Sequence, residues 1–357
     1  MSEEESGRQE QIKEIMAGIE NGIQDLFQSG RLEAYLKVMS KFHRYSLNNT
    51  ILIWTQCPTA TYCAGFQTWK NEFGRHVKKG EKGIKILAPA PFKKTVQVKK
   101  LDSVTHMPVR DADGQIAMEE QTIQIPRYKT VTIFDLAQTE GPPLPELAAE
   151  LTGDVQQYDA FMEALRRTSP VPVEIKPIQG DADGFFSRET QSITLREGMS
   201  QIQTVCAAIH EIVHSIQHNN EQANGKSKAV KEVEAESCAM AVSAFYGLDT
   251  SANSIPYLGS YSRDKTVPEL RNSLQIIMET TDRLITEIDR HFAEVCAERG
   301  ISIPERLEVR PGRTSAVPCE EQGTGVEVQQ SLQTARQYEN RRGRRRPARK
   351  KNTGKER

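Results

Sequence analysis

The run from Val205 to His214 has the form His-Glu-x-x-His inside an apolar, helix-favouring stretch of the chain. On an α-helix, residues four positions apart project from one face, so His210 and His214 can both point a ring nitrogen at one cation. Glu211 lies beside them as a candidate general base. The alternative is an ordinary helix with surface histidines. The apolar neighbours favour a buried helix, where unpaired His and Glu are costly, and the pattern therefore predicts a zinc site.

A catalytic zinc ion usually has three protein ligands and a water, so a third ligand is expected downstream. The segment from Lys231 to Gly247 predicts a second helix with three glutamates near its start. Glu232 and Glu236 share one face, whereas Glu234 points roughly to the opposite side. We assign Glu232 as the third ligand and Glu236 as the carboxylate that receives the other N–H of a ligating histidine. Glu236 as ligand is the main rival, and three solvated acids favoured by the helix dipole are a further alternative.

Two neighbouring features have weaker interpretations. His218 continues the four-residue series of the motif but lies one turn too far along the helix to share the metal, so we expect a capping or core-edge role. Upstream, Asp183 to Leu195 predicts a hairpin. Zinc peptidases commonly hold a peptide as an added strand at a sheet edge, and Ser192 to Leu195 is the candidate edge here. A hairpin that binds nothing is equally consistent with these residues.

Residues 70–100 are strongly basic: they carry ten Lys and Arg against Glu72 and Glu81, a local net charge of +8. Binding of single-stranded DNA needs cations that follow the phosphates and aromatic faces on which bases stack. Trp54 ends an apolar run and is expected to be buried. Asn48 and Asn49 are expected to cap the helix that begins near Thr50, with contact to nucleotide edges as the alternative. The candidate nucleic-acid contacts are Trp69, Arg75, Lys78, Lys79, Lys82 and Lys85.

Composition is compatible with a soluble protein of two domains. Of the 357 residues, 37% are hydrophobic and 27% charged, and the mean hydropathy is −0.58, without an apolar run near the length of a membrane span. The acidic, polar start resembles neither a secretory signal nor a transit peptide. The six cysteines form no C-x-x-C pair. We therefore expect a cytoplasmic protein without a membrane partner.

Helical periodicity and a boundary signal divide the chain. Amphipathic helices are expected between residues 12 and 42, followed by a small sheet, and Gly141 to Pro145 is the clearest break because consecutive prolines stop regular structure. The expected fold class is α+β. We expect a helix-plus-sheet DNA-binding domain at 9–138, a linker at 139–148 and a second domain with the metal-site helices at 149–298.

The carboxyl-terminal part from residue 303 loses apolar periodicity and is expected to be a disordered basic tail. Residues 341–357 hold ten cations and one acid, a net charge of +9. Since the whole chain has a net charge of −1, residues 1–340 carry −10. Such blocks often bind nucleic acid through counterion release, although a solubilising tail is the alternative.

The metal-site motifs resemble those of a known family. The segment His210 to His214, the helix with Glu232 and Glu236, and the segment Ile255 to Tyr261 look like the zincin domain of ArdC-type antirestriction proteins, which is related to peptidases of the ImmA and IrrE type. The resemblance implies one zinc ion per chain, two histidine ligands, a glutamate of the second helix as third ligand, and Glu211 as catalytic base. In the last segment, Tyr257 or Tyr261 could donate a hydrogen bond to a developing oxyanion, but packing is the favoured role.

The amino-terminal part is similar to the single-stranded-DNA-binding domain of the same family. The segments that carry this similarity are Phe42 to Trp54, Gly65 to Lys70 and Gly74 to Lys85. The resemblance covers roughly residues 9–290. It implies a protein of plasmids or integrative elements that coats incoming single-stranded DNA during conjugation and protects it from host restriction.

Three functions remain open from the sequence. DNA binding is the main function in the first, with a structural or weakly active zinc site. In the second, DNA delivers a specific zinc protease that cleaves a host restriction or regulatory protein. Metal-dependent DNA cleavage is the third and least favoured, because the motif lacks the several carboxylates of two-metal sites.

Overall fold

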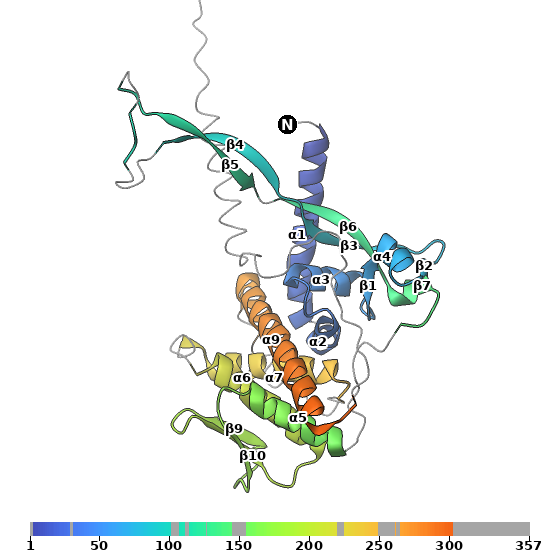
Figure 1. The fold of residues 1–357 in the computed structure, drawn as a ribbon, viewed down its shortest axis with the longest axis vertical. Coiled ribbons are helices and arrows are strands. Elements are labelled where there is room, and N and C mark those ends of the chain that lie inside the picture. Colours follow the sequence, from blue (N-terminus) through green and yellow to red (C-terminus); the bar gives the residue numbers. More distant parts are fainter. Residues whose placement is uncertain are drawn as a thin grey trace, which may run out of the picture. The chain divides into compact units, whose positions relative to one another are not determined.

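The computed structural model describes two compact units (Figure 1). The described residues are 3–28, 31–100, 107–110, 114–125, 127–144, 155–219, 225–248, 261 and 265–302. The larger unit comprises residues up to Leu87 and from Thr130 onward, and the smaller unit comprises Ala88–Lys129. Helices and sheets are both present, so the expected α+β class is confirmed. The predicted basic tail from residue 303 lies outside the described residues.

Three helices open the larger unit, and the hydrophobic periodicity predicts the first two of them. They are α1 (Glu3–Gln28), α2 (Leu32–Lys41) and α3 (Leu47–Gln56). Each turns an apolar face inward, and Ile19, Ile23 and Leu36 are fully buried. The hydroxyl groups of Tyr35 on α2 and Thr50 on α3 are hydrogen-bonded at 2.8 Å. Apolar packing thus holds the three helices together, and a buried polar contact fixes how α2 meets α3.

A small sheet follows these helices. Its strands are β1 (Cys63–Gly65), β3 (Ile84–Pro89) and β6 (Tyr128–Asp135), in the order β1-β6-β3. Four short elements adjoin it: α4 (Phe66–Asn71), β2 (His76–Val77), the 3-10 helix η1 (Leu136–Gln138) and β7 (Thr139–Glu140), with β2 paired to β7. The carboxylate of Asp135 accepts N–H groups of Thr61, Tyr62 and Ala137, at 2.7, 3.1 and 2.9 Å. One buried side chain therefore ties β1 to the end of β6.

The smaller unit is a two-stranded antiparallel ribbon. It pairs β4 (Phe92–Lys99) with β5 (Met118–Ile125), from Phe92 opposite Ile125 to Lys99 opposite Met118. Its large apolar side chains stay partly in water: Phe92 is 42% exposed and Met118 54%. The ribbon therefore combines exposed apolar side chains with exposed lysines such as Lys93 and Lys94.

In the second half of the chain, the described residues form a three-stranded sheet and four long helices. The elements are α5 (Val155–Thr168), β8 (Val173–Lys176), β9 (Gly184–Ser187), β10 (Ser192–Arg196), α6 (Gln201–Gln217), α7 (Lys228–Phe245) and α9 (Val267–Arg299). The strand order is β8-β10-β9, with β10 parallel to β8 and antiparallel to β9. Ser192 to Leu195 is thus the central strand, and its prediction as a sheet edge is wrong. Pairing with β8, which the hairpin pattern did not reveal, moves the edge to β9.

Helix α9 joins both halves of the larger unit. It packs against α1, α2, α3, α5 and α7, and α2 packs on α7 as well. The Nδ1 atom of buried His43 lies 2.7 Å from Oδ1 of Asp282, and Arg271 donates to Asn48 at 2.7 Å. Helices on both sides of the expected linker therefore share one core. None of the helices in the described part of the chain has the length and apolar character required to cross a bilayer.

The Asp135 contacts predict a loss of stability. Asp135→Ala removes one acceptor from three N–H groups, two of which belong to the chain segment that enters β1. Because unpaired buried donors are costly, we expect the free energy of unfolding to fall by roughly 2–4 kcal/mol in urea denaturation. The control Asp159→Ala, at an exposed position of α5, should change it by less than about 0.5 kcal/mol. Equal stability of the two variants would contradict this account.

Candidate metal centre

Helix α6 presents two histidines and a glutamate on neighbouring positions of a buried segment. Ser200 caps it: the hydroxyl oxygen of Ser200 accepts the backbone N–H of Gln203 at 3.3 Å, and the side-chain oxygen of Gln203 accepts the backbone N–H of Ser200 at 3.1 Å. Apolar residues then bury the helix against α7, β9 and β10. His210 and His214 project side by side, one turn apart, with their Nε2 atoms 3.0 Å apart. The helix predicted around the motif is present at the expected place.

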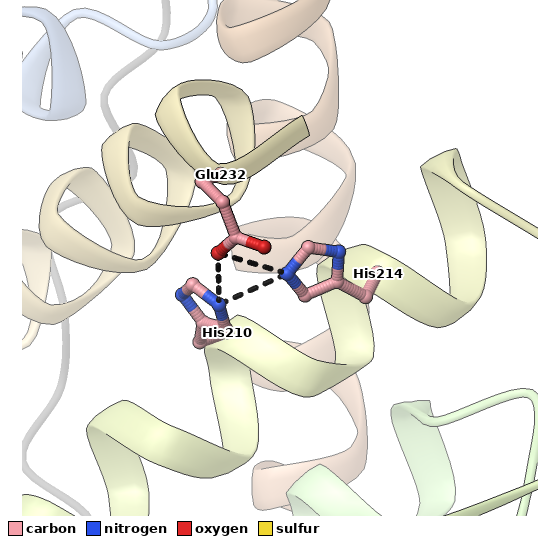
Figure 2. A group of neighbouring side chains, drawn as sticks. All are labelled: His210, His214 and Glu232. Atoms are coloured by element: carbon pink, nitrogen blue, oxygen red, sulfur yellow. Dashed lines mark hydrogen bonds and ion pairs between the residues drawn. The ribbon is translucent and has the colours of Figure 1, made fainter. Parts of the chain in front are cut away.

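Helix α7 supplies a carboxylate to the same point. Its cap is Ser227, which accepts the N–H of Val230 at 3.4 Å. The Oε2 atom of Glu232 lies 3.6 Å from Nε2 of His210 and 3.7 Å from Nε2 of His214. Figure 2 shows the two rings and the carboxylate converging from two helices. In the described part of the chain, these three residues are the one group of His, Cys, Asp and Glu whose ligand atoms gather closely enough to hold a metal ion.

The donor set fits a divalent metal. Ligand atoms of a tetrahedral zinc ion, each about 2.0–2.1 Å from the metal, lie roughly 3.3–3.4 Å from one another. The three separations here, 3.0, 3.6 and 3.7 Å, bracket that value. Two imidazole nitrogens and one carboxylate oxygen are also the ligand types of many catalytic zinc sites. The geometry therefore has room for one cation bound by three side chains.

The site attracts positive charge. Burial alone would lower the pKa of His210, but the carboxylates of Glu232 and Glu236 outweigh this effect and raise it to about 10. The neighbouring imidazole rings of His210 and His214 hold the pKa of Glu232 well below its usual range. A proton on His210 thus occupies the position where a metal would supply the same compensating charge.

Glu236 lies where the sequence reasoning expected it. Its Oε2 atom is 3.0 Å from Nδ1 of His210, on the side of the ring away from Glu232. An ionised carboxylate only accepts hydrogen bonds, so Nδ1 of His210 carries the proton and Nε2 faces the cluster. The contact distinguishes the two glutamates: Glu232 points at both Nε2 atoms, whereas Glu236 contacts the far nitrogen of one ring.

Glu211 is a buried carboxylate beside β9. Burial raises its pKa, and the backbone of Phe186 donates a hydrogen bond to it. A methyl group on Gly184 would lie 3.2 Å from Cγ of Glu211 and 3.1 Å from the carbonyl oxygen of Thr194, so a glycine lets β9 pass this close. A carboxyl group with a raised pKa next to a metal site has the properties of a general base.

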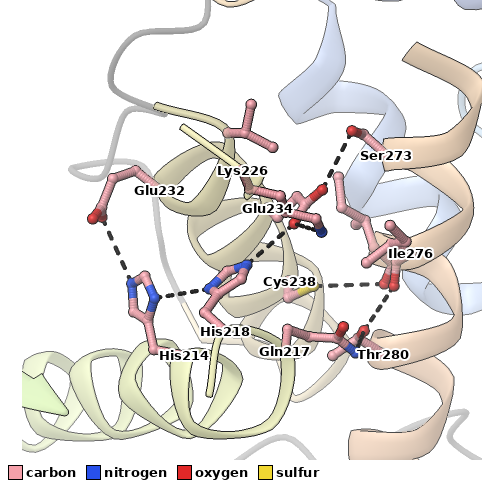
Figure 3. Close-up of polar contacts among 12 residues, drawn as sticks. His214, Gln217, His218, Lys226, Glu232, Glu234, Cys238, Ser273, Ile276 and Thr280 are labelled. Carbon is pink, nitrogen blue, oxygen red and sulfur yellow. Dashed lines mark hydrogen bonds and ion pairs between the residues drawn. The ribbon is translucent and has the colours of Figure 1, made fainter. Parts of the chain in front are cut away.

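A second group of polar residues continues inward from His214. The Nδ1 atom of His214 lies 2.9 Å from Nδ1 of His218, and Nε2 of His218 lies 3.1 Å from Oε2 of Glu234 (Figure 3). Lys226 donates to the same oxygen at 2.7 Å. His218 is the C-cap of α6, so the expected capping role is confirmed, but the prediction missed these side-chain contacts. The His214–His218 spacing of four residues was the available signal, but the position of Glu234 depends on how α7 packs.

Tyr261 has a packing role, as favoured from the sequence. It is buried, its ring lies 5.9 Å from that of Phe27, and its hydroxyl group donates to Ser273 at 2.5 Å. Tyr257, the other candidate for oxyanion stabilisation, lies outside the described residues.

Two predicted nucleic-acid contacts need correction. Trp69 is fully buried, and its Nε1 donates to the carbonyl of Phe134 at 2.9 Å, so no ring face is left for a base. Arg75 is buried as well and donates to Thr139, Gly141 and Pro142. Both side chains hold the small sheet and its adjoining turn together. The pattern of aromatic and basic residues did not distinguish this role from DNA contact.

The lysines behave differently from Trp69 and Arg75. Lys78, Lys79, Lys82 and Lys85 are all exposed, and one of them, Lys78, donates to the carbonyl of Ala137 at 2.9 Å. The loop that carries them is held by Gln138, whose amide donates to Glu81 and to the carbonyl of Lys82 at 3.0 Å each. These positions are available to phosphate groups.

The expectations for three residues near α3 had mixed outcomes. Trp54 is buried, as expected. Asn48 and Asn49 do not cap the helix, because α3 begins after Ser46 and contains them. Asn49 instead exchanges two hydrogen bonds of 2.9 Å with the backbone of Leu87, tying α3 to β3.

Comparisons with known proteins identify one part of the chain. Residues 6–134 match the family model of the N-terminal domain of the anti-restriction factor ArdC. An uncharacterized protein of Bacillus anthracis is 27% identical over 319 residues, which cover 81% of this chain and 53% of that protein. The chain thus spans about half the length of this relative.

Two crystal structures of the antirestriction protein ArdC from plasmid R388 are also similar. The metal-free structure is 19% identical with a TM-score of 0.44, and the match covers 77% of this chain and 98% of that one. The Mn(II)-bound structure is 17% identical with a TM-score of 0.40, covering 76% and 98%. The family match thus shows an ArdC-type amino-terminal domain at residues 6–134, as the sequence motifs of that part predicted.

Proposed function

We propose that this protein is a single-stranded-DNA-binding antirestriction protein of a mobile element, with a zinc-dependent, metallopeptidase-like site on α6 and α7. The convergence of two Nε2 atoms and one carboxylate oxygen beside a buried glutamate carries the metal half of the proposal. The DNA half is supported by the exposed lysines of the ArdC-type domain. A cytoplasmic location, where incoming DNA meets restriction enzymes, is part of the same proposal.

The DNA interface is proposed around the loop between β2 and β3. Within the described residues, no carboxylate lies within ion-pairing distance of Lys79, Lys82 or Lys85, so their charges are free to neutralise phosphates. Stacking partners must come from exposed aromatic rings, because Trp54 and Trp69 are buried. Phe66 on α4 is 51% exposed, and we assign base stacking to this phenylalanine.

The metal site supports a hydrolytic function. A zinc ion, when bound, would polarise a carbonyl group and lower the pKa of a water molecule. His210, His214 and Glu232 would hold it, and Glu236 would keep the proton of His210 on Nδ1. Glu211 would take a proton from the water and return it to the leaving amine, a role that suits a carboxyl group whose pKa is raised by burial.

An edge strand beside Glu211 favours a specific protease as the second candidate function. The N–H of Ile193 in β10 bonds to Pro172 on the β8 side, so the polar groups of its partner Phe186 face away from β10. The N–H of Phe186 reaches Glu211 at this open edge. An extended peptide added along β9 would therefore pass the proposed base. A host restriction or regulatory protein would be the substrate in this alternative.

Metal binding tests the ligand assignment. We expect purified protein to bind one zinc ion per chain in competition with a chromogenic chelator. Glu232→Ala should weaken binding by more than 100-fold because it removes a ligand, and Glu236→Ala by about 10- to 100-fold because it removes a partner of a ligand. Glu197→Ala, at an exposed position before α6, is the matched control. A larger effect of Glu236→Ala than of Glu232→Ala would reverse the assignment.

DNA binding tests the lysine loop. The triple variant Lys79→Ala, Lys82→Ala, Lys85→Ala should bind a labelled oligonucleotide more weakly at low salt. The slope of log affinity against log salt should fall by about 2, since each lost phosphate contact on a single strand contributes about 0.7. Alanine at Lys37, Lys41 and Lys228, three exposed lysines elsewhere, is the control. Equal slopes for the two triple variants would exclude the loop as the interface.

The variant Glu211→Gln separates the two candidate functions. If DNA binding is the main function, it should keep zinc content, DNA affinity and protection of incoming DNA during conjugation, because Glu211 lies in the metal domain and not among the lysines. Loss of protection in cells, with zinc content and DNA affinity retained, would instead establish the specific protease. Transfer frequency into a restricting host, with the Glu232→Ala variant alongside, is the measurement.

A further inference from the structure

We propose that His218, Glu234 and Lys226 form a positioning relay that fixes the ring protonation of His214, so that its Nε2 offers a lone pair to the cation site. The inference rests on the proposed metal site and deepens it. None of the three residues belongs to the donor set of two histidines and Glu232. Their hydrogen bonds form one continuous path from the buried core to a ligand ring (Figure 3).

The hydrogen-bonded path has a fixed direction, because Glu234 at its buried end only accepts hydrogen bonds. Glu234 is 1% exposed. Lys226 donates to its Oε2 atom at 2.7 Å and Ser273 donates to its Oε1 atom at 3.4 Å, so both oxygens accept hydrogen bonds and the lysine pairs with the ionised carboxylate. An ionised carboxylate has no proton to donate, and therefore the 3.1 Å contact with Nε2 of His218 requires a proton on that nitrogen.

The donor and acceptor roles in His218 in turn determine those in His214. A neutral imidazole with a proton on Nε2 has a lone pair on Nδ1. That atom faces Nδ1 of His214 at 2.9 Å, so His214 must donate there. The remaining nitrogen of His214, Nε2, then carries a lone pair. It is the atom that lies 3.0 Å from His210 and 3.7 Å from Glu232.

The result is a convergence of acceptors that needs a cation. Glu236 gives His210 the same ring form by direct contact with its Nδ1 atom. Two Nε2 lone pairs and the oxygens of Glu232 would then repel one another, unless a proton or a metal ion lies among them. His214 differs from His210 in being held through a second histidine. That extra ring allows a carboxylate from deep in the core to set its ring form.

Further contacts hold the residues of the relay in place. Lys226 precedes the cap of α7 and compensates the buried charge, while Ser273 of α9 donates to the other oxygen of Glu234 at 3.4 Å. His218 is 4% exposed and ends α6. A buried charge is costly unless it is paired and hydrogen-bonded, and both oxygens of Glu234 accept hydrogen bonds. The three residues, which contact α6, α7 and α9, therefore hold the ring of His214 in one orientation.

Two variants and two measurements test the relay. His218→Phe keeps a ring but removes the acceptor, and Glu234→Gln keeps the shape of the side chain but removes the charge. The first measurement is the pattern of ring nitrogen-15 shifts of His214 in zinc-free protein. The wild type should show His214 with its proton on Nδ1, and both variants should show a mixture of the two ring forms. The second measurement is zinc affinity, which should fall about 10- to 100-fold in both.

The control is His291→Phe, at a buried histidine of α9 whose Nδ1 contacts Thr168, away from the relay. It should change neither measurement. If Glu234→Gln folds like the wild type and leaves His214 entirely in the Nδ1-protonated form with unchanged zinc affinity, the relay is excluded. If wild-type protein binds no zinc, the metal site itself fails, whereas the nitrogen-15 pattern in zinc-free protein still tests the relay separately.

Discussion

The packing of α7 against α2, α6 and α9 is the arrangement on which the site depends. Small side chains such as Ala235, Ala239 and Ala241 are buried along α7 and let the neighbouring helices approach closely. With the helix held in this way, its three glutamates serve three purposes. Glu232 reaches the histidine pair, Glu236 reaches the far nitrogen of His210, and Glu234 turns inward toward α9. A rotation of α7 by one residue would break all three contacts.

Much of this could be predicted from the sequence, because it follows from helix geometry. The four-residue spacing within the motif and between Glu232 and Glu236 defines which side chains share a face, and that face is the one that meets α6. The small sheet after the amino-terminal helices and the hairpin of β9 and β10 also appear where the sequence predicts them. Local periodicity and local chemistry are sufficient for such features.

The errors concern features that depend on contacts between distant segments. Trp69 carries the signature of a stacking platform, yet the carbonyl of Phe134, 65 residues away, accepts its N–H and the sheet buries its ring. Strand β10 loses its place at the edge because β8 pairs with it in parallel, which no local pattern reveals. Glu234 points away from the metal, as expected, but its role depends on His218 reaching it from α6. In each case the deciding partner lies on another element.

The shared core of α2, α7 and α9 bears on how such a protein can change during evolution. Proteins built from independent modules exchange them by recombination, because each module covers its own apolar surface. Here the amino-terminal helices cover part of the surface of α7 and α9, and His43 pairs with Asp282 across the junction. A recombinant that replaced residues 1–140 would leave that surface uncovered and its charges unmatched. The two halves must therefore be inherited together, and substitutions along α2 and α7 must compensate one another.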